Sequence, residues 1–191
     1  VELLPEPEAL GLLALMLHAE ARRPARRDGA GRYVPLGEQD VARWSRPLIA
    51  EADAVLQRAQ ALGMIGRFQL EAAVQSAHAA RRHLGHSDWP AIVTLYDALL
   101  ALTGSPVVAV NRAAALAEIE TPAMGLAALD AIAADPRIAE YQPYWAARAA
   151  LLARLGDRER ADQAYQLAIG LEADPALRDF LESRRAALSA P

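Results

Sequence analysis

Two arginines at equivalent positions of a repeated segment could bind an acidic ligand. Arg112 and Arg148 lie 36 residues apart, at the same place in two similar segments. A guanidinium binds carboxylates and phosphates through paired hydrogen bonds, so two of them on adjacent helical hairpins could line a recognition groove. Ion pairs with neighbours such as Asp130 or Glu118 explain the same arginines equally well. From helix phase, the residues we expect along such a groove are Tyr96, Asp97, Asn111, Arg112 and Arg148.

A second group of arginines lies near the N-terminus, in the segment 22–33. This segment also contains proline and glycine, which predicts an exposed, mobile loop. The arginines at 22, 23, 26 and 27 could contact phosphates or an acidic partner. A run of charged residues in a loop usually contacts only water, however, and acidic residues flank this run at Glu20 and Asp28.

No pattern of a catalytic centre stands out. The chain has no cysteine, so thiolate nucleophiles, thiolate zinc sites and disulfides are excluded. Gly29-x-Gly31 lacks the preceding strand and the third glycine that pyrophosphate binding needs. Neither a nucleophile elbow, nor a zinc-protease motif, nor a phosphate-binding loop is present. We therefore expect a protein that is not an enzyme and has no cofactor.

The histidines give only weak signals for a metal site. His83, His86 and Asp88 have a spacing that could hold a metal, but they fall in a turn rich in glycine and serine, which favours a solvated loop. His78 shares a helix face with alanines, so we expect it to be packed with a satisfied ring nitrogen. The sequence thus predicts no metal site.

The composition predicts an all-α protein. Alanine, the strongest helix former, makes up about a quarter of the chain, while aromatic residues are only 5%. We expect about seven to nine helices, stacked as antiparallel hairpins in a tetratricopeptide-like right-handed solenoid. The expected helices cover about 5–21, Glu38 or Asp40 to Gly63, Phe68–Arg82, Asp88–Gly104, two hairpins from Ser105, and a terminal capping helix at Ala176–Ala187.

The repeat pattern is clearest in the second half. The segment from Trp145 follows the tetratricopeptide spacing, except that Arg148 replaces a leucine. In this register small residues, Gly125 and Ala161, occupy equivalent places and let paired helices approach closely. Equivalent large residues would fill the space between hairpins, namely Leu129 and Tyr165.

Organisation and charge limit the possible partners. We divide the chain into residues 1–65 and a repeat region at 66–191, which together form one continuous domain. Because the chain begins at Val1 in a helical pattern, we expect a longer polypeptide. The net charge of −4 argues against nucleic-acid binding by this part. Without a membrane span or a signal sequence, a cytoplasmic location is expected.

One segment adds a much more specific signal than helical periodicity. Residues 32–44, which we call the signature segment, read RYVPLGEQDVARW. They fit the approximate pattern D-G-x-L-V-P-L-x-E-Q-D-x-x-x-W of extracytoplasmic-function sigma factors that carry a long tetratricopeptide-like C-terminal extension. Tyr33, Val41 and Ser45 depart from the usual residues. The chain resembles this family over nearly its whole length, including GRFQLEAAVQSAHA from Gly66 and SPVVAVNRAAALAE from Ser105.

This resemblance implies two upstream domains that open the −10 and read the −35 promoter elements. The present domain would then contact the sigma core, the RNA polymerase or a signal, and promoter DNA only through those upstream domains. Independent peptide scaffolding and small-molecule sensing remain alternatives. The residues of the signature segment that could contact a partner are Arg32, Asp40, Arg43 and Trp44. A purely structural interpretation is also open, in which Gln39 or Asp40 caps the helix and Trp44 anchors it in the core.

Overall fold

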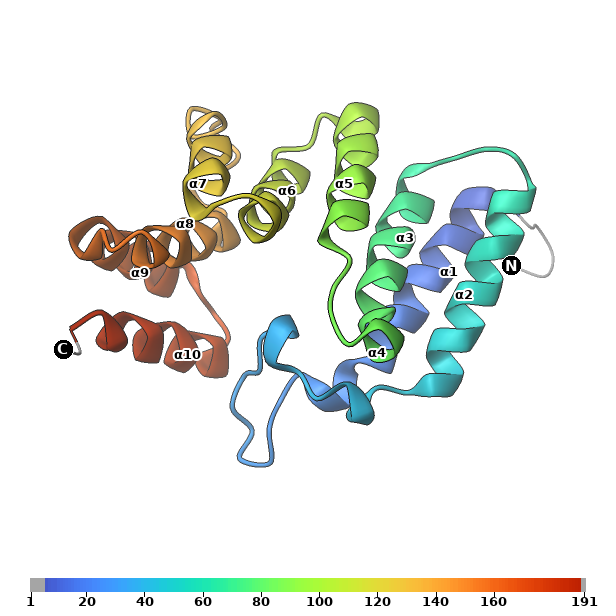
Figure 1. Cartoon of the computed structure of the whole chain (residues 1–191), viewed down its shortest axis with the longest axis horizontal. Coiled ribbons are helices and arrows are strands. Elements are labelled where there is room, and N and C mark those ends of the chain that lie inside the picture. The colour runs from blue at the N-terminus through green and yellow to red at the C-terminus, as the bar shows by residue number, and fades with distance from the viewer. Residues whose placement is uncertain (1–5, 190–191) are drawn as a thin grey trace. The chain divides into compact units, whose positions relative to one another are not determined.

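The computed structural model describes residues 6–189, and none of these lies in a β-strand (Figure 1). The all-α prediction is confirmed. Ten α-helices lie in this range, and one of them, α4, has only four residues. Their bounds are α1 Pro7–Ala21, α2 Arg46–Ala61, α3 Arg67–Ala79, α4 Arg81–Leu84, α5 Trp89–Thr103, α6 Pro106–Ile119, α7 Pro122–Asp130, α8 Gln142–Arg154, α9 Arg158–Leu171 and α10 Pro175–Ala186. Short 3-10 turns are η1 Arg23–Ala25, η2 Leu36–Glu38, η3 Val41–Arg43 and η4 Ala187–Ser189.

The helices form two compact units. The first contains the residues up to Asp28 and Val34–Gly104, and the second contains Gly29–Tyr33 with the residues from Ser105 onward. In the first unit α3 packs on both α1 and α5. The sequence-based division after residue 65 stays a prediction.

In the first unit, α1 lies between α2 and α3 (Figure 1). Leu10 and Ala14 of its predicted apolar stripe are buried to 1% and 0% exposure. Gly11 faces α3 so closely that a Cβ there would lie 2.6 Å from the backbone nitrogen of Gln69. Only glycine permits this distance, because real Cβ atoms do not approach other atoms so closely.

The long helix predicted from Glu38 or Asp40 begins later, at Arg46. Two 3-10 turns, η2 and η3, occupy the preceding residues, and that part of the prediction is wrong. Asp40 does accept a backbone hydrogen bond, but from Ala42 within η3, at 2.9 Å. The N-cap of α2 is Ser45, with proline in the first helical turn. Proline is favoured there because an N–H in the first turn has no intrahelical acceptor, so proline loses no helical hydrogen bond.

The second unit contains the hairpins that the repeat pattern predicts. Helices α6 and α7 pair, α8 and α9 pair, and α6 also packs on α8. Gly125 permits the close approach of α7 to α6, since an added Cβ would lie 2.7 Å from the Cβ of Ala117. Ala161 is fully buried at the equivalent place, and Leu129 and Tyr165 are buried in the same core. These repeat predictions are confirmed.

Helix α10 has the predicted character of a terminal cap. Leu181 is buried to 3% exposure and Phe180 packs partly against the core. Arg178, Glu182 and Arg184 are exposed. The helix therefore covers the repeats with one apolar face and presents a polar face to solvent.

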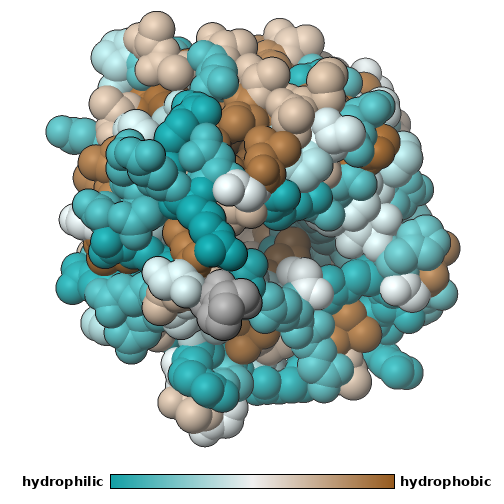
Figure 2. Space-filling model, turned by 60° about the vertical axis from the view of Figure 1, so that its left-hand side comes forward, coloured by the Kyte–Doolittle hydropathy of each residue, from teal (hydrophilic) through white to brown (hydrophobic). Residues whose placement is uncertain are grey.

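Most of the face drawn in Figure 2 is hydrophilic, with apolar side chains scattered among polar ones. A few large apolar side chains of the described residues are strongly exposed. Met16 and Met64 are 61% exposed and Ile65 is 74% exposed. Of these three, only Met16 lies within a helix.

Candidate functional site

One arginine outside the signature segment holds much of that segment in place. The guanidinium of Arg81 donates hydrogen bonds to the backbone carbonyls of Leu36, Gly37 and Gln39, at 3.1, 3.1 and 2.9 Å. Its central carbon also lies 5.1 Å from the centroid of the Trp44 ring. Three carbonyl contacts and a cation–π contact from one side chain fix the path of this loop.

Two side chains of the signature segment point inward. Trp44 is only 2% exposed and packs with Ala21, Ile49 and Ala79. Gln39 is 8% exposed, and its amide nitrogen donates to the carbonyl of Val34 at 3.2 Å. The interpretation of Trp44 as a core anchor is confirmed.

Other signature residues remain exposed. Asp40 and Arg43 are exposed, and Arg43 donates a hydrogen bond to the carbonyl of Arg27 at 3.0 Å. Arg32 is exposed as well. Asp40 and Arg43 thus have local structural contacts and still present charge to solvent.

The arginine-rich segment begins in an ordered turn. Arg23 forms an exposed ion pair with Glu20 at 3.0 Å, and Arg26 donates to the carbonyl of Ala19 at 3.1 Å. Arg22 donates to the side chain of Gln75 on α3. These three arginines therefore have hydrogen-bond or ion-pair partners on α1 and α3, while Arg23 and Arg26 remain exposed as the composition predicted.

The predicted groove residues fall in both units. Tyr96 and Asp97 lie on α5 of the first unit, whereas Asn111 and Arg112 lie on α6 and Arg148 on α8 of the second. Asp97 and Asn111 are exposed, and the other three are half-buried. A groove lined by all five residues stays a prediction.

Arg148 has the ion pair that the structural alternative predicted. It contacts Asp130 of α7, and its guanidinium also lies 3.4 Å from the hydroxyl of Tyr144. Glu118, the other acid considered, pairs with Arg154 instead. Arg148 therefore links α8 to α7 within the hairpin stack.

The histidines do not assemble a metal site in the described residues. His83 and His86 are exposed, and Asp88 uses one carboxylate oxygen to cap α5 through the backbone N–H of Ala91, at 3.1 Å. Among residues 6–189, no group of three or more His, Cys, Asp or Glu side chains is placed to hold a metal. His78 is buried and packs edge to face on Trp89, with ring centroids 5.7 Å apart.

The sequence did not reveal a polar cluster inside the first unit. His18 of α1 is 1% exposed, and its Nε2 lies 3.4 Å from a carboxylate oxygen of Asp53 on α2. Ser76 of α3 donates its hydroxyl to the same oxygen at 2.7 Å. Burial lowers the pKa of His18, although Asp53 acts in the opposite direction. His18 continues the stripe of Leu10 and Ala14 by one further turn, which is a signal that could have found it.

This cluster is not arranged for nucleophilic catalysis. In a nucleophilic triad the serine donates to the histidine, and the carboxylate orients that histidine. Here Ser76 donates to Asp53, so its proton is directed away from His18. The near-complete burial of His18 also leaves no room for a substrate. The cluster connects three helices.

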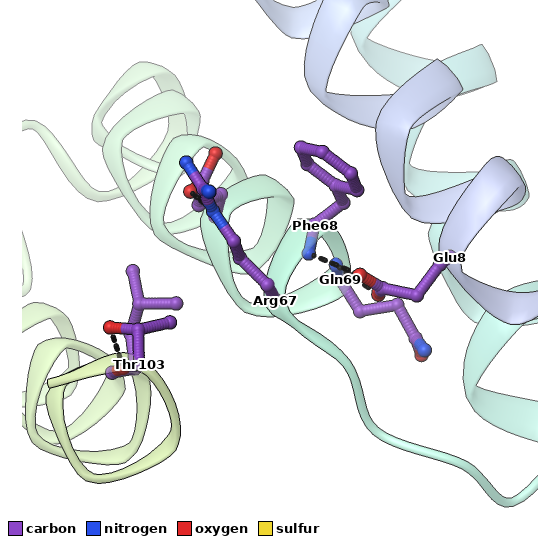
Figure 3. Close-up of polar contacts among 7 residues, drawn as sticks. Glu8, Arg67, Phe68, Gln69 and Thr103 are labelled. Carbon is purple, nitrogen blue, oxygen red and sulfur yellow. Dashed lines mark hydrogen bonds and ion pairs between the residues drawn. The ribbon is translucent and has the colours of Figure 1, made fainter. Parts of the chain in front are cut away.

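A carboxylate of α1 caps α3. Glu8 accepts hydrogen bonds from the backbone N–H groups of Phe68 and Gln69, at 3.0 and 3.4 Å (Figure 3). These groups belong to the first turn of α3, whose N-cap, Gly66, has no side chain to serve them. A Cβ on Gly66 would lie 2.1 Å from a carboxylate oxygen of Glu8, so the glycine leaves space for the acid.

No described helix is both long and apolar enough to cross a bilayer.

Comparison with known proteins gives two matches. Residues 1–60 match a family of unknown function, DUF6596. An uncharacterised protein of Rhizobium meliloti (strain 1021) is 39% identical over 166 residues, which cover 87% of this chain and 39% of the relative. The chain thus spans about two fifths of the length of that relative. No solved structure gives a significant match.

The family match locates the signature segment within a recurrent sequence unit. It covers α1, the arginine-rich turn and the signature segment, and it ends inside α2. Arg81 lies beyond it. The side chain that holds the segment therefore comes from outside the matched residues.

Proposed function

We propose that this chain is the regulatory, protein-interaction C-terminal domain of an extracytoplasmic-function sigma factor. It would modulate transcription initiation through contacts with the sigma core, the RNA polymerase or a signal. The observation that carries the proposal is the fit of residues 32–44 to the signature of that family. The family match of residues 1–60, which includes this segment, is consistent with it.

The fixed path of the signature segment also supports an interaction role. Arg81 and Trp44 hold the backbone, while Asp40 and Arg43 remain exposed. A surface loop that is preorganised in this way loses little conformational entropy on binding. Charged side chains on such a loop favour recognition of a protein partner by electrostatic complementarity.

The remaining parts of the proposal follow from the same assignment. The domain would be cytoplasmic and not an enzyme, and it would bind no cofactor. Its partners would be the upstream sigma domains and the polymerase core, and promoter DNA would be contacted only by those upstream domains. The net charge of −4 agrees with a domain that does not itself bind DNA.

Promoter-dependent transcription with reconstituted polymerase tests the proposal. The longer polypeptide that carries this chain would be compared with a version truncated just before Val1. Loss of transcription would make the domain a positive element, and a gain would make it a built-in inhibitor. Unchanged transcription from every promoter tested would contradict the proposal.

A matched pair of surface variants in the longer polypeptide separates a specific contact from a general effect of charge. Arg43→Glu reverses an exposed charge of the signature segment, and Arg46→Glu reverses an exposed charge in the first turn of α2. We expect the first to change transcription and the second to leave it near the unmodified level. Equal effects of the two would argue against a role for the signature segment.

A general scaffold or a small-molecule sensor is the second candidate. The hairpins of the second unit favour it, together with a hollow of about 390 Å³ lined by Tyr165, Arg158 and Arg184 among others. Solenoids of this type commonly bind peptides on a concave surface. A peptide or small anion that binds the isolated chain, combined with unchanged transcription on truncation, would favour this candidate.

A further inference from the structure

Helix α1 carries apolar side chains on faces that the other helices of the first unit do not cover. Its sequence PEALGLLALMLHAEA has almost no polar face. Helices that are apolar all round are normally buried on all sides. In the first unit α1 packs on α2 and α3, yet Met16 remains 61% exposed and Leu12 remains 38% exposed.

The uncovered side forms a hollow and not a flat patch. Its volume is about 500 Å³, and most of its lining is apolar. The spacing of Leu13, Met16 and Leu17 at i, i+3 and i+4 places these side chains in one stripe along α1. The complete lining is Leu13, Met16, Leu17, Ala19, Glu20, Arg23 and Arg26. We call this the α1 hollow.

The end of the α1 hollow near η1 is basic. Arg23 has a side chain that is 75% exposed, and it pairs with Glu20, whose side chain is 54% exposed. Exposed ion pairs of this kind are weak, so an incoming carboxylate can replace Glu20. Arg26 bonds the carbonyl of Ala19 through one guanidinium nitrogen. Further guanidinium N–H groups of Arg26 can therefore serve a carboxylate.

We propose that the α1 hollow is the docking site of a protein partner that presents an acidic amphipathic helix. Apolar side chains of that helix enter the hollow over Met16, and acidic residues at one end pair with Arg23 and Arg26. Methionine suits such a surface, because its flexible thioether adapts to different apolar side chains. Helix-in-groove recognition uses anchors at the same i, i+3, i+4 spacing that the hollow offers.

Charge complementarity favours this occupant over two others. A basic helix would meet two arginines at the end of the hollow. A second copy that offered the same surface would bring its own Arg23 and Arg26, and only Glu20 would offset them. The inference uses only the interaction part of the proposed function and concerns α1, which lies outside the signature segment.

Fluorescence anisotropy with two labelled peptides tests the docking site on the 191-residue chain. Both peptides are synthetic amphipathic helices of about 18 residues, with leucines at i, i+3, i+4 and i+7. One carries glutamates and the other carries lysines at the flanking positions. We expect the acidic peptide to bind and the basic peptide to bind at least about tenfold more weakly.

Two methionine variants identify the surface. Met16→Glu places a charge in the hollow, whereas Met64→Glu changes an equally exposed methionine elsewhere in the first unit. We expect Met16→Glu to weaken acidic-peptide binding about tenfold or more and Met64→Glu to leave it unchanged. Circular dichroism and thermal melting check that both variants fold. Arg26→Ala should weaken binding of the acidic peptide and should not weaken binding of the basic peptide, because it removes a charge that repels the lysines.

Several results would overturn the proposal. They are no binding of the acidic peptide, equal binding of both peptides, or equal effects of the two methionine variants. Sedimentation that shows a dimer broken by Met16→Glu would assign the hollow to self-association instead. Binding of neutral vesicles that Met16→Glu abolishes would assign it to a lipid surface. None of these results would alter the transcription test, so the two proposals can fail separately.

Discussion

The guanidinium of Arg81 lies 5.1 Å from the centroid of the Trp44 ring and donates to three backbone carbonyls of the loop that leads to it. Trp44 is 2% exposed and anchors the loop in the core, while Arg81 holds the loop backbone through hydrogen bonds. We call this pair of residues the clamp. A loop without regular secondary structure thereby gains a defined path. The clamp makes the first unit sensitive to both residues.

Trp44→Ala should lower the free energy of unfolding by about 3–5 kcal/mol, because it removes a large buried ring and leaves a cavity. Urea or thermal unfolding followed by circular dichroism measures this loss. Trp145→Ala is a useful comparison, since that ring is only half-buried, and we expect a smaller effect. An unchanged melting temperature for Trp44→Ala would refute the anchoring role.

Arg81→Met should destabilise the first unit by about 2–3 kcal/mol, because three loop carbonyls lose a charged donor. Arg81→Lys should recover only part of this loss, since a single ammonium cannot reproduce the planar donor geometry. Arg58→Met, at an exposed position on α2, is the matched control and should have little effect. Equal stability of the Arg81 and Arg58 variants would show that the clamp is unimportant.

Glu8→Ala should cost about 1–2 kcal/mol, because two N–H groups of the first turn of α3 lose their acceptor. Glu8→Gln keeps an oxygen acceptor without the charge and should cost less. Glu51→Ala, at an exposed position of α2, serves as the control for removing an acid. Native-state hydrogen exchange at Phe68 and Gln69 would report local loss of the cap, and unchanged exchange would argue against it.

How much of this architecture was predictable depended on whether a local pattern determined it. The tetratricopeptide spacing identified Gly125 and Tyr165 correctly, because each repeat packs mainly on its neighbours. The predicted start of α2 was wrong, because the apolar periodicity through Trp44 looked helical although two 3-10 turns precede the helix. Contacts between distant residues, such as Glu8 with Phe68, leave no periodic signal.

The site was less predictable than the fold for the same reason. Trp44 could be identified as an anchor from the signature segment, but its partner Arg81 lies 37 residues further along the chain, after two helices, α2 and α3. Arg148 was equally compatible with a groove and with an ion pair, and its partner Asp130 could be identified only from the packing of α7 against α8. Spacing defines the face of a helix, whereas the neighbour that covers it depends on tertiary packing.

Gly11→Ala and Gly125→Ala should each be strongly destabilising, by about 1–3 kcal/mol or more, because the added methyl overpacks a helix crossing. The new Cβ would lie 2.6 Å from the backbone nitrogen of Gln69 in the first case and 2.8 Å from the carbonyl oxygen of Ala113 in the second. Backbone atoms at such contacts cannot move aside easily.

Gly170→Ala is the control for these glycine variants. It lies in α9 with no atom within 4 Å of its added Cβ. The substitution should be neutral or stabilise by up to about 1 kcal/mol, because alanine favours helix over glycine. Differential scanning calorimetry of the three variants measures the order, and a Gly11→Ala protein as stable as Gly170→Ala would disprove the close crossing of α1 and α3.

The stability of the first unit should fall as the pH drops from about 6.5 to about 4. Burial, with smaller contributions from Arg22 and Arg81, lowers the pKa of His78 to about 4 from its ordinary 6.5. Between these values the unfolded chain binds a proton that the folded one does not, so acid favours unfolding. A difference of this size corresponds to about 3 kcal/mol, fully lost below pH 4.

His78→Phe should flatten the pH profile, because it keeps an aromatic contact with Trp89 and removes the titrating group. Some slope should remain, since burial also lowers the pKa of His18. Urea unfolding at pH 7 and pH 4.5 gives the comparison. If His78→Phe and the unmodified chain lost the same stability between these pH values, burial of a neutral His78 would not be the cause.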